Sequence, residues 1–204
     1  MKIIDLSVPI NEKTPVYPGD PKHEINQTAN IDEQGWNECR LTFNTHFSTH
    51  IDAPYHMIKN GKKLSEYPLD KLIGEGVMLD VRNGFDLDIL DSVEKDSIVL
   101  LWTGQSEKLY TSYFENANFV PKEFAEKLVK LNVKLIGIDS FSPDEPPFEV
   151  HKILLKNDVL IVENLTNLDK LANKKFRVFI LPLKLENTDG APCRAIAVLD
   201  LMGS

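Results

Sequence analysis

Hydrophobic positions along this chain form short runs that are rich in β-branched residues and separated by polar stretches, a pattern typical of strands. Strands are predicted over Lys2–Leu6, Glu38–His46, Gly76–Val81, Ser97–Trp102, Lys134–Ile138, Val159–Val162, Phe176–Leu183 and Arg194–Leu199. The prolines and the glycine between Thr14 and Pro21 predict turns. The first half of the chain is therefore expected to consist mostly of strands and loops.

Apolar residues at helical spacing appear in the second half of the chain. A helix is predicted from Pro121, whose fixed φ and missing N–H suit a first helical position, to near Asn132. Its apolar stripe is formed by Phe124, Leu128 and Leu131. A second helix is predicted over Val150–Lys156 and a short one over Leu168–Ala172. Because helices and strands alternate here, we expect an α/β fold with some parallel pairing, in a single mixed α/β domain covering residues 1–204.

Composition agrees with a globular protein of 204 residues, with 42% apolar and 26% charged residues. The longest apolar runs are far shorter than the roughly 18 residues of a membrane helix, and Asp5 interrupts any signal-peptide core. Acidic residues outnumber basic ones by 31 to 23, so the chain is expected to be repelled by nucleic acid. Cys39 and Cys193 are too few for a disulfide scaffold and are predicted to be free thiols in a reducing cytoplasm.

Histidines are concentrated in one short segment that contains His46, His50 and His56, with Asp52 among them. By chance, a window of this length would hold about 0.3 histidines. In an extended strand, His46, His50 and Asp52 would project from one face, because side chains alternate with period two. The opposite face would carry Phe43, Thr45, Phe47, Thr49 and Ile51. Pro54 is expected to end this strand and to leave His56 at its rim.

Imidazoles and a carboxylate are ligands that suit Zn²⁺ or another first-row ion. Three protein ligands leave a position for water, which is typical of catalytic sites, and a bound ion lowers the pKa of that water from about 15.7 to about 7. His56, if not a ligand, is then free to transfer protons. The alternatives are a group of purely structural histidines and a structural zinc site. Both are disfavoured, because polar groups on one strand face need partners and structural zinc sites usually have four ligands, often cysteines.

The segment His46-Phe-Ser-Thr-His50-Ile-Asp52-Ala-Pro54-Tyr-His56 closely resembles the His-x-Gly-Thr-His-x-Asp-x-Pro-x-His signature of the cyclase-like metal hydrolases. That family includes bacterial kynurenine formamidases (arylformamidases) and isatin hydrolases. Further similar segments are Asp5–Ser7, Pro15–Asp20, Gly137–Ser140, His151–Leu165 and Asp189–Ala195. The resemblance covers nearly the whole chain and implies the kynurenine-formamidase-like fold, with its metal site on a β-strand.

The resemblance also implies a site for two divalent ions per chain, zinc or manganese. Its expected ligands are His46, His50, Asp52, His151 and Glu163. Asp52 is expected to bridge the ions, His56 to transfer protons and Tyr17 to contact the substrate. From the residues alone, His151 would be interpreted as a capping residue and Glu163 as a surface carboxylate. However, Glu163 follows a run of apolar residues, where an unpaired charge is unusual, and this supports a ligand role.

The implied activity is that of a cytoplasmic metal-dependent amidohydrolase that cleaves a C–N bond of a small linear amide, with N-formylkynurenine from tryptophan catabolism as the leading substrate. Hydrolysis of a cyclic amide or lactone is the alternative within the family. A non-catalytic metal-binding or ligand-binding protein on the same scaffold is the rival of another class, although retention of His56 argues against it. The family resemblance further implies a homodimer or a homotetramer.

Several positions differ from the family pattern. Ser48 replaces the signature glycine, Tyr17 stands where formamidases usually have tryptophan, and the segment Ser142–Phe148 is peculiar to this chain. Trp102 and Gln105 replace a common arginine and tryptophan. Trp36, Phe47 and Tyr17 are candidates for the pocket wall, although composition alone favours a place in the core for each of them. All four changes are expected to touch the pocket wall, and only Ser48 belongs to the metal motif, so the reaction class is better predicted than the substrate.

Overall fold

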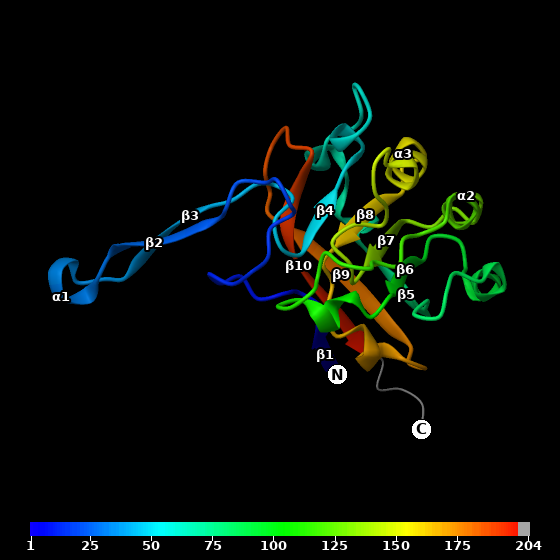
Figure 1. The fold of residues 1–204 in the computed structure, drawn as a ribbon, viewed down its shortest axis with the longest axis horizontal. Coiled ribbons are helices and arrows are strands. Elements are labelled where there is room, and N and C mark those ends of the chain that lie inside the picture. Colours follow the sequence, from blue (N-terminus) through cyan, green and yellow to red (C-terminus); the bar gives the residue numbers. More distant parts are fainter. Residues whose placement is uncertain (200–204) are drawn as a thin grey trace.

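The computed structural model describes residues 1–199. Its strands are β1 (Lys2–Asp5), β2 (Glu24–Ala29), β3 (Glu38–Thr42), β4 (His50–Asp52), β5 (Ile73–Asp80), β6 (Ile98–Trp102), β7 (Leu135–Ile138), β8 (Leu160–Glu163), β9 (Phe176–Pro182) and β10 (Gly190–Leu199). The α-helices are α1 (Ile31–Gln34), α2 (Lys122–Lys130) and α3 (Glu149–Lys156) (Figure 1). The predicted short helix after β8 is a 3₁₀ turn over Leu168–Leu171. The predicted domain end, residue 204, lies outside the described residues.

Most of these strands form a barrel-like sheet. Their order is β10-β4-β8-β7-β6-β5-β9, and β9 pairs back to β10, so the ring is closed; β1 adds to β10 beside it. The strands β5, β6, β7 and β8 run parallel to one another, whereas β4, β9 and β10 pair antiparallel to their neighbours. The prediction of a mixed α/β fold with parallel pairing is therefore confirmed.

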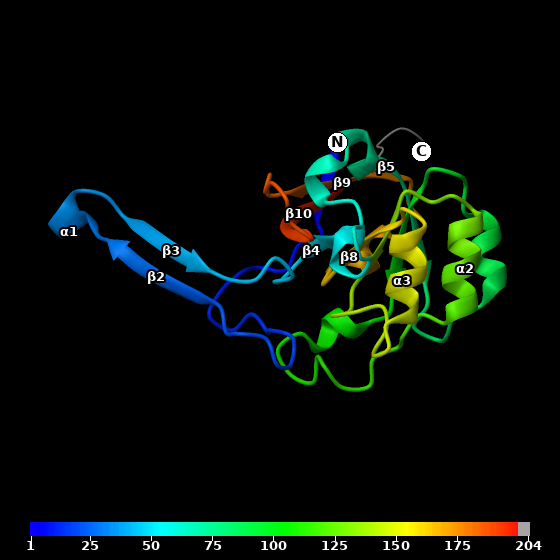
Figure 2. The ribbon, with the colours of Figure 1, turned by 90° about the horizontal axis from the view of Figure 1, so that it is seen from above.

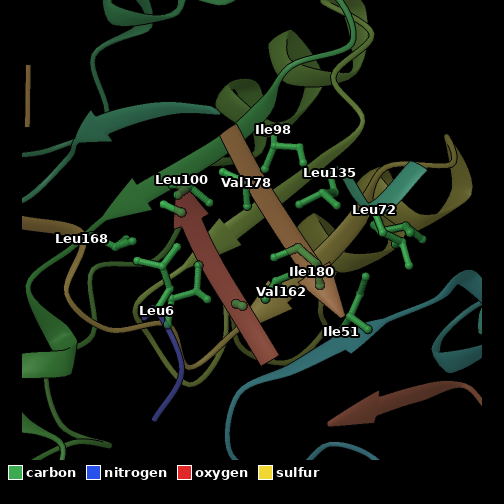
Figure 3. Packing of buried hydrophobic residues seen from close by; sticks show 14 of the residues in the cluster. Leu6, Ile51, Leu72, Ile98, Leu100, Leu135, Val162, Leu168, Val178 and Ile180 are labelled. Carbon is green, nitrogen blue, oxygen red and sulfur yellow. The ribbon is translucent and has the colours of Figure 1, made fainter. Parts of the chain in front are cut away.

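The parallel strands β6, β7 and β8 are buried on both faces, which explains their continuous apolar runs. In β6, Ile98 and Leu100 point into the barrel, where Figure 3 shows them packed with Leu135 and Val178. The alternate residues of β6 instead belong to a second apolar cluster that lies beneath α2 and α3. The stripe predicted for the first helix packs there too, through Phe124 and Leu128.

A two-stranded arm made of β2, α1 and β3 extends away from the barrel (Figures 1 and 2). The strand predicted over Glu38–His46 is wrong in extent, because it ends at Thr42 and belongs to this arm. The sequence prediction missed β2 altogether, since most of its side chains face solvent and so provide no run of apolar residues.

The remaining boundaries differ from the predicted ones by a few residues. Pro121 is the N-cap of α2 and not its first helical residue, with φ −66° and ψ 149°. The last strand begins at Gly190, four residues before the predicted Arg194. Within residues 1–199, Cys39 and Cys193 are free thiols, as predicted. Among these residues, no helix has the length and apolar character needed to cross a membrane.

Candidate active site

The short strand β4 carries two of the predicted ligands. His50 and Asp52 lie on one face of it, while Ile51 between them points into the barrel core. The prediction of one extended strand through His46 is wrong, because Ser48 has φ 56° and turns the chain before β4 begins. His46 therefore lies in a turn. It still reaches the site, with its Nδ1 atom 2.7 Å from Asp52 Oδ1.

Two further predicted ligands come from elements that are distant in sequence. Glu163 ends β8 directly opposite His50 in the antiparallel ladder, and His151 belongs to the first turn of α3. His50 Nε2 lies 3.3 Å from Glu163 Oε2, and His151 Nε2 lies 3.2 Å from Glu163 Oε1. The structure thus brings together all five residues expected to be ligands.

Two buried atoms at the centre of this cluster lack hydrogen-bond partners. They are His50 Nε2 and Asp52 Oδ2, in side chains that are 2% and 1% exposed. His50 Nε2 is only 3.2 Å from Asp52 Oδ1, yet the orientation does not make a hydrogen bond. Buried polar atoms are almost always satisfied, so a missing partner needs an explanation. A cation bound between these groups would supply it.

The donor set also fits a metal. One group of converging ligand atoms is His50, Asp52 and Glu163; another is His46, Asp52 and His56; within each group all the atoms lie within 4.8 Å. Asp52 belongs to both groups, as a bridging carboxylate would. Imidazole and carboxylate are zinc ligands. The second group also places His56 within ligand distance, whereas the family resemblance implies proton transfer for this residue.

Electrostatics in the cluster reflect this crowding of imidazoles and carboxylates. Burial lowers the pKa of His46 and His151, but the neighbouring carboxylates outweigh it and raise the pKa values to about 9 and about 10. Burial raises the pKa of Asp52, but the histidine charges outweigh it and hold that pKa well below its usual range. Burial is the main cause of the lowered pKa of His56. The negative charge of the carboxylates can be balanced either by protonated imidazoles or by a bound cation. Binding of a metal ion therefore releases protons from the imidazoles.

Two carboxylates that sequence reasoning did not select orient the histidines. Asp144 accepts hydrogen bonds from His151 Nδ1 at 2.5 Å and from Val150 N at 2.6 Å. Asp189 Oδ2 lies 2.9 Å from His46 Nε2 and 3.6 Å from His56 Nδ1. Histidine ligands usually donate their second ring nitrogen to such a carboxylate. Asp144 is next to another acidic residue, Glu145, in the segment Ser142–Phe148, and no pattern in the sequence connects it to His151.

A cavity of about 470 Å³ opens onto the histidines and Glu163. One wall is aromatic: the Tyr17 ring centroid lies 6.3 Å from that of Phe114 and 6.0 Å from that of Phe141. Tyr17 and Phe47 line this cavity as predicted, whereas Trp36 lies on the arm, 59% exposed, and belongs neither to the pocket nor to the core. Phe114 and Phe141 had no sequence signal.

Comparisons with known proteins agree with this geometry. The model of the family described as “Putative cyclase” matches residues 4–145. Kynurenine formamidase from Bacillus thuringiensis subsp. konkukian is 32% identical over 206 residues, covering 95% of each chain, and that from Erythrobacter litoralis is 31% identical over 201 residues, covering 96% of this chain and 93% of its own.

Solved structures show the same fold. An isatin hydrolase bound to the product analogue thioisatinate superposes with a TM-score of 0.88 at 21% identity, covering 98% of this chain and 93% of its own. A potential metal-dependent hydrolase with cyclase activity has a TM-score of 0.82 at 28% identity and 96% coverage of both chains.

A barrel that carries a buried histidine and carboxylate cluster beside an open cavity defines the class of cyclase-like metal-dependent hydrolases. The chain belongs to the cyclase family, as its match to the family model and its formamidase relatives show. The resemblance inferred from the histidine segment is thereby confirmed, and the chain is a hydrolytic enzyme of this family.

Proposed function

We propose that this protein hydrolyses the C–N bond of a small linear aryl amide, with an N-formylated aromatic amine such as N-formylkynurenine as the leading substrate. The observation that carries the proposal is the buried cluster of imidazoles and carboxylates that opens into a cavity with an aromatic wall. The formamidase relatives, similar over nearly the full chain, support the same reaction.

The proposed ligands of two divalent ions, zinc or manganese, are His46, His50, Asp52, His151 and Glu163. Asp52 would bridge the two ions, since its carboxylate belongs to both groups of converging atoms. The unpartnered atoms His50 Nε2 and Asp52 Oδ2 would each gain a ligand bond. A divalent ion in this site supplies a Lewis acid and makes hydroxide available at neutral pH.

The protein side chains would orient the amide and move its proton. His56 Nδ1 faces Asp189, 3.6 Å away, which leaves Nε2 to pass a proton to the leaving nitrogen. The ring of His56 lies against that of His46, tilted by 33° and with centroids 3.9 Å apart, so it is held beside the ligands. Tyr17, Phe114 and Phe141 would receive the aryl ring, since aromatic pairs favour edge-to-face and offset contacts.

Opening of a cyclic amide or lactone is the second candidate. It is favoured by the likeness to isatin hydrolase, whose fold superposes over 98% of this chain. The same site could hydrolyse the carbonyl group of a linear amide or that of a ring. The shape of the pocket therefore decides which substrate is accepted. The expected homodimer or homotetramer and the cytoplasmic location are parts of this proposal.

Metal content by elemental mass spectrometry on untagged protein, together with turnover of N-formylkynurenine, tests the proposal. About two ions per chain with turnover would support it. Metal without turnover of this substrate would replace the linear amide by a cyclic amide or lactone. Failure to bind any metal, even after zinc or manganese is added, would refute the proposed site.

A further inference from the structure

A second cavity, of about 330 Å³, adjoins the aromatic wall of the catalytic cavity. The two cavities share Tyr17, Phe114 and Phe141 as lining residues, so these three rings form a partition between them. In Figure 2 the green connection from β6 to α2 passes beside the blue loop that precedes β2. Because Tyr17 is 38% exposed, its ring can change rotamer and open the partition.

The rest of the second cavity is mainly apolar. Its remaining lining residues are Pro18, Ala117, Phe119 and Pro146, with Asn116 and Glu145 as the polar members. The ring of Phe119 stands at 88° to that of Phe141, with centroids 6.1 Å apart, and so extends the aromatic surface of the partition. Concave sites with apolar and aromatic walls and few polar groups are typical of small-molecule binding.

Charge restricts what the second cavity accepts. Neither cavity has a lysine or an arginine among its lining residues, all of which belong to residues 1–199. The one charged side chain that lines the second cavity within this part of the chain is the exposed Glu145. An anionic group would therefore find no counter-charge here, whereas an uncharged apolar group needs none.

One side of the second cavity is fixed by Gln105, which replaces a common tryptophan of the family. Gln105 is 2% exposed, and its Nε2 donates hydrogen bonds to the carbonyl oxygens of Tyr113 and, at 3.1 Å, of Glu115. These two residues flank Phe114 in sequence. A buried amide whose donors are both satisfied holds this turn in one conformation, so the ring of Phe114 stays in the partition.

The segment Ser142–Phe148, which is peculiar to this chain, builds the other side. Its two ends line the catalytic cavity, whereas Glu145 and Pro146 in its middle line the second one. Its Pro143 carbonyl accepts a hydrogen bond from Val120 N at 2.8 Å, which ties it to the residues that precede α2. One segment thus shapes both cavities.

We propose that the second cavity is a substrate subsite, and that the enzyme accepts an aryl amide whose ring carries a second, uncharged apolar group. This inference rests on the proposed amide hydrolysis, which places the carbonyl at the metal ligands and the first ring against the partition. The next group along the substrate would then lie against Phe119 and Pro146. A substrate with a single ring would leave these apolar side chains in water, so a second ring gains burial.

Turnover of formanilide and of N-(biphenyl-4-yl)formamide by the metal-loaded enzyme tests the proposal. The ratio of the two kcat/KM values should favour the two-ring substrate by about 10-fold or more, as expected for an apolar group that fits a pocket. Ala117→Trp fills the second cavity alone and should bring this ratio close to that of equal substrates. The matched control Ala172→Trp changes another half-buried alanine, outside both cavities, and should keep the wild-type ratio.

A carboxylate on the second ring tests the role of charge. N-(4′-carboxybiphenyl-4-yl)formamide should lose most of the gain in wild type, because Glu145 repels it, and should regain it in Glu145→Lys. An undiminished preference for this anionic substrate in wild type would overturn the assignment of an uncharged group.

Calorimetry with the product amines, aniline and biphenyl-4-amine, separates this inference from the proposed function, because it needs no turnover. Tighter binding of the two-ring amine that is lost in Ala117→Trp would support the subsite; failure to hydrolyse either formanilide would then refute the proposed function alone. Equal binding of the two amines by wild type would overturn the subsite. So would a two-ring preference that survives in Ala117→Trp. Phe119→Ala removes part of the same wall and should also lower the preference, so it replaces Ala117→Trp if that variant does not fold.

Discussion

In the first turns of both α3 and α1, a side-chain oxygen accepts hydrogen bonds from two backbone N–H groups, but the surroundings are opposite: Asn30 is the N-cap of α1, whereas Asp144 reaches α3 from the preceding loop. Asp144 Oδ2 accepts hydrogen bonds from Val150 N and His151 N, while Asn30 Oδ1 accepts them from Asp32 N and Glu33 N. Asp144 is buried, and its other oxygen accepts from the ring of His151. Asn30 caps a helix with no buried residue at the tip of the arm. Similar hydrogen bonds at the start of a helix therefore have a functional consequence only where distant segments of the chain converge.

The candidate active site and the arm differ in the same way when each is taken as a whole. Side chains of the site come from a turn, β4, α3 and β8, and each touches members from other segments. The arm is held by the pairing of β2 with β3, which has a register irregularity between Gln27 and Ala29. Substitutions should couple strongly within the site and act locally in the arm.

Removing Asp52 should produce the largest effect. In Asp52→Ala, both groups of ligand atoms lose their shared member, so metal content should fall to background and turnover with it. The buried imidazole of His50 and the partly buried imidazole of His46 would also lose their counter-charge, and breaking a buried pair costs about 3–5 kcal/mol. Elemental mass spectrometry and urea unfolding measure the two effects. Asp169→Ala, an exposed carboxylate, is the control. Full metal content in Asp52→Ala would show that Asp52 does not bridge.

His56→Ala should separate chemistry from metal binding. If His56 transfers the proton, turnover should fall by about 10²–10⁴-fold while metal content stays near that of wild type. The measurement distinguishes two roles, because the ring nitrogen of His56 lies close enough to the Asp52 carboxylate for both to bind the same ion. Loss of metal along with activity would make His56 a ligand and would move proton transfer to another group.

The sequence predicts the buried elements of the fold better than the irregular and exposed ones. The buried barrel strands and α2 could be predicted, because their apolar periodicity reflects burial directly. Spacing identified His50 and Asp52 correctly as neighbours on a strand face. It failed at His46, since nothing in the residue pattern shows that Ser48 adopts a left-handed conformation.

Other parts of the site depend on tertiary packing alone. Glu163 and His151 came only from the family resemblance, because their contacts are made by β8 lying beside β4 and by α3 covering that face. Asp144 and Phe114 lie in irregular segments whose placement has no periodic signature. Two elements of the arm, β2 and α1, were missed because most of their side chains face solvent, where apolar periodicity carries no information.

Asp144→Asn should have an intermediate effect on the site. An amide keeps an oxygen for the helix N–H groups but cannot serve as an anionic acceptor for His151 Nδ1 as well. Metal affinity should fall by about 10–100-fold, the usual cost of losing a carboxylate that orients a histidine ligand. Competition with a chromogenic chelator measures it. Glu149→Gln, an exposed carboxylate of the same helix turn, should leave the affinity unchanged.

Asn30→Ala tests the opposite side of the comparison and should have the smallest effect. Loss of an N-cap often costs about 0.5–2 kcal/mol, but only when the helix unfolds together with the rest of the protein. Since α1 buries no residue, the arm tip can open while the barrel stays folded, and the free energy of unfolding should change by less than about 0.5 kcal/mol. Hydrogen exchange should accelerate at Asp32 and Glu33 and remain unchanged in β6 and β7. Destabilisation of the barrel strands would show that the arm is coupled to the core, so that its stability could not be treated as a local property.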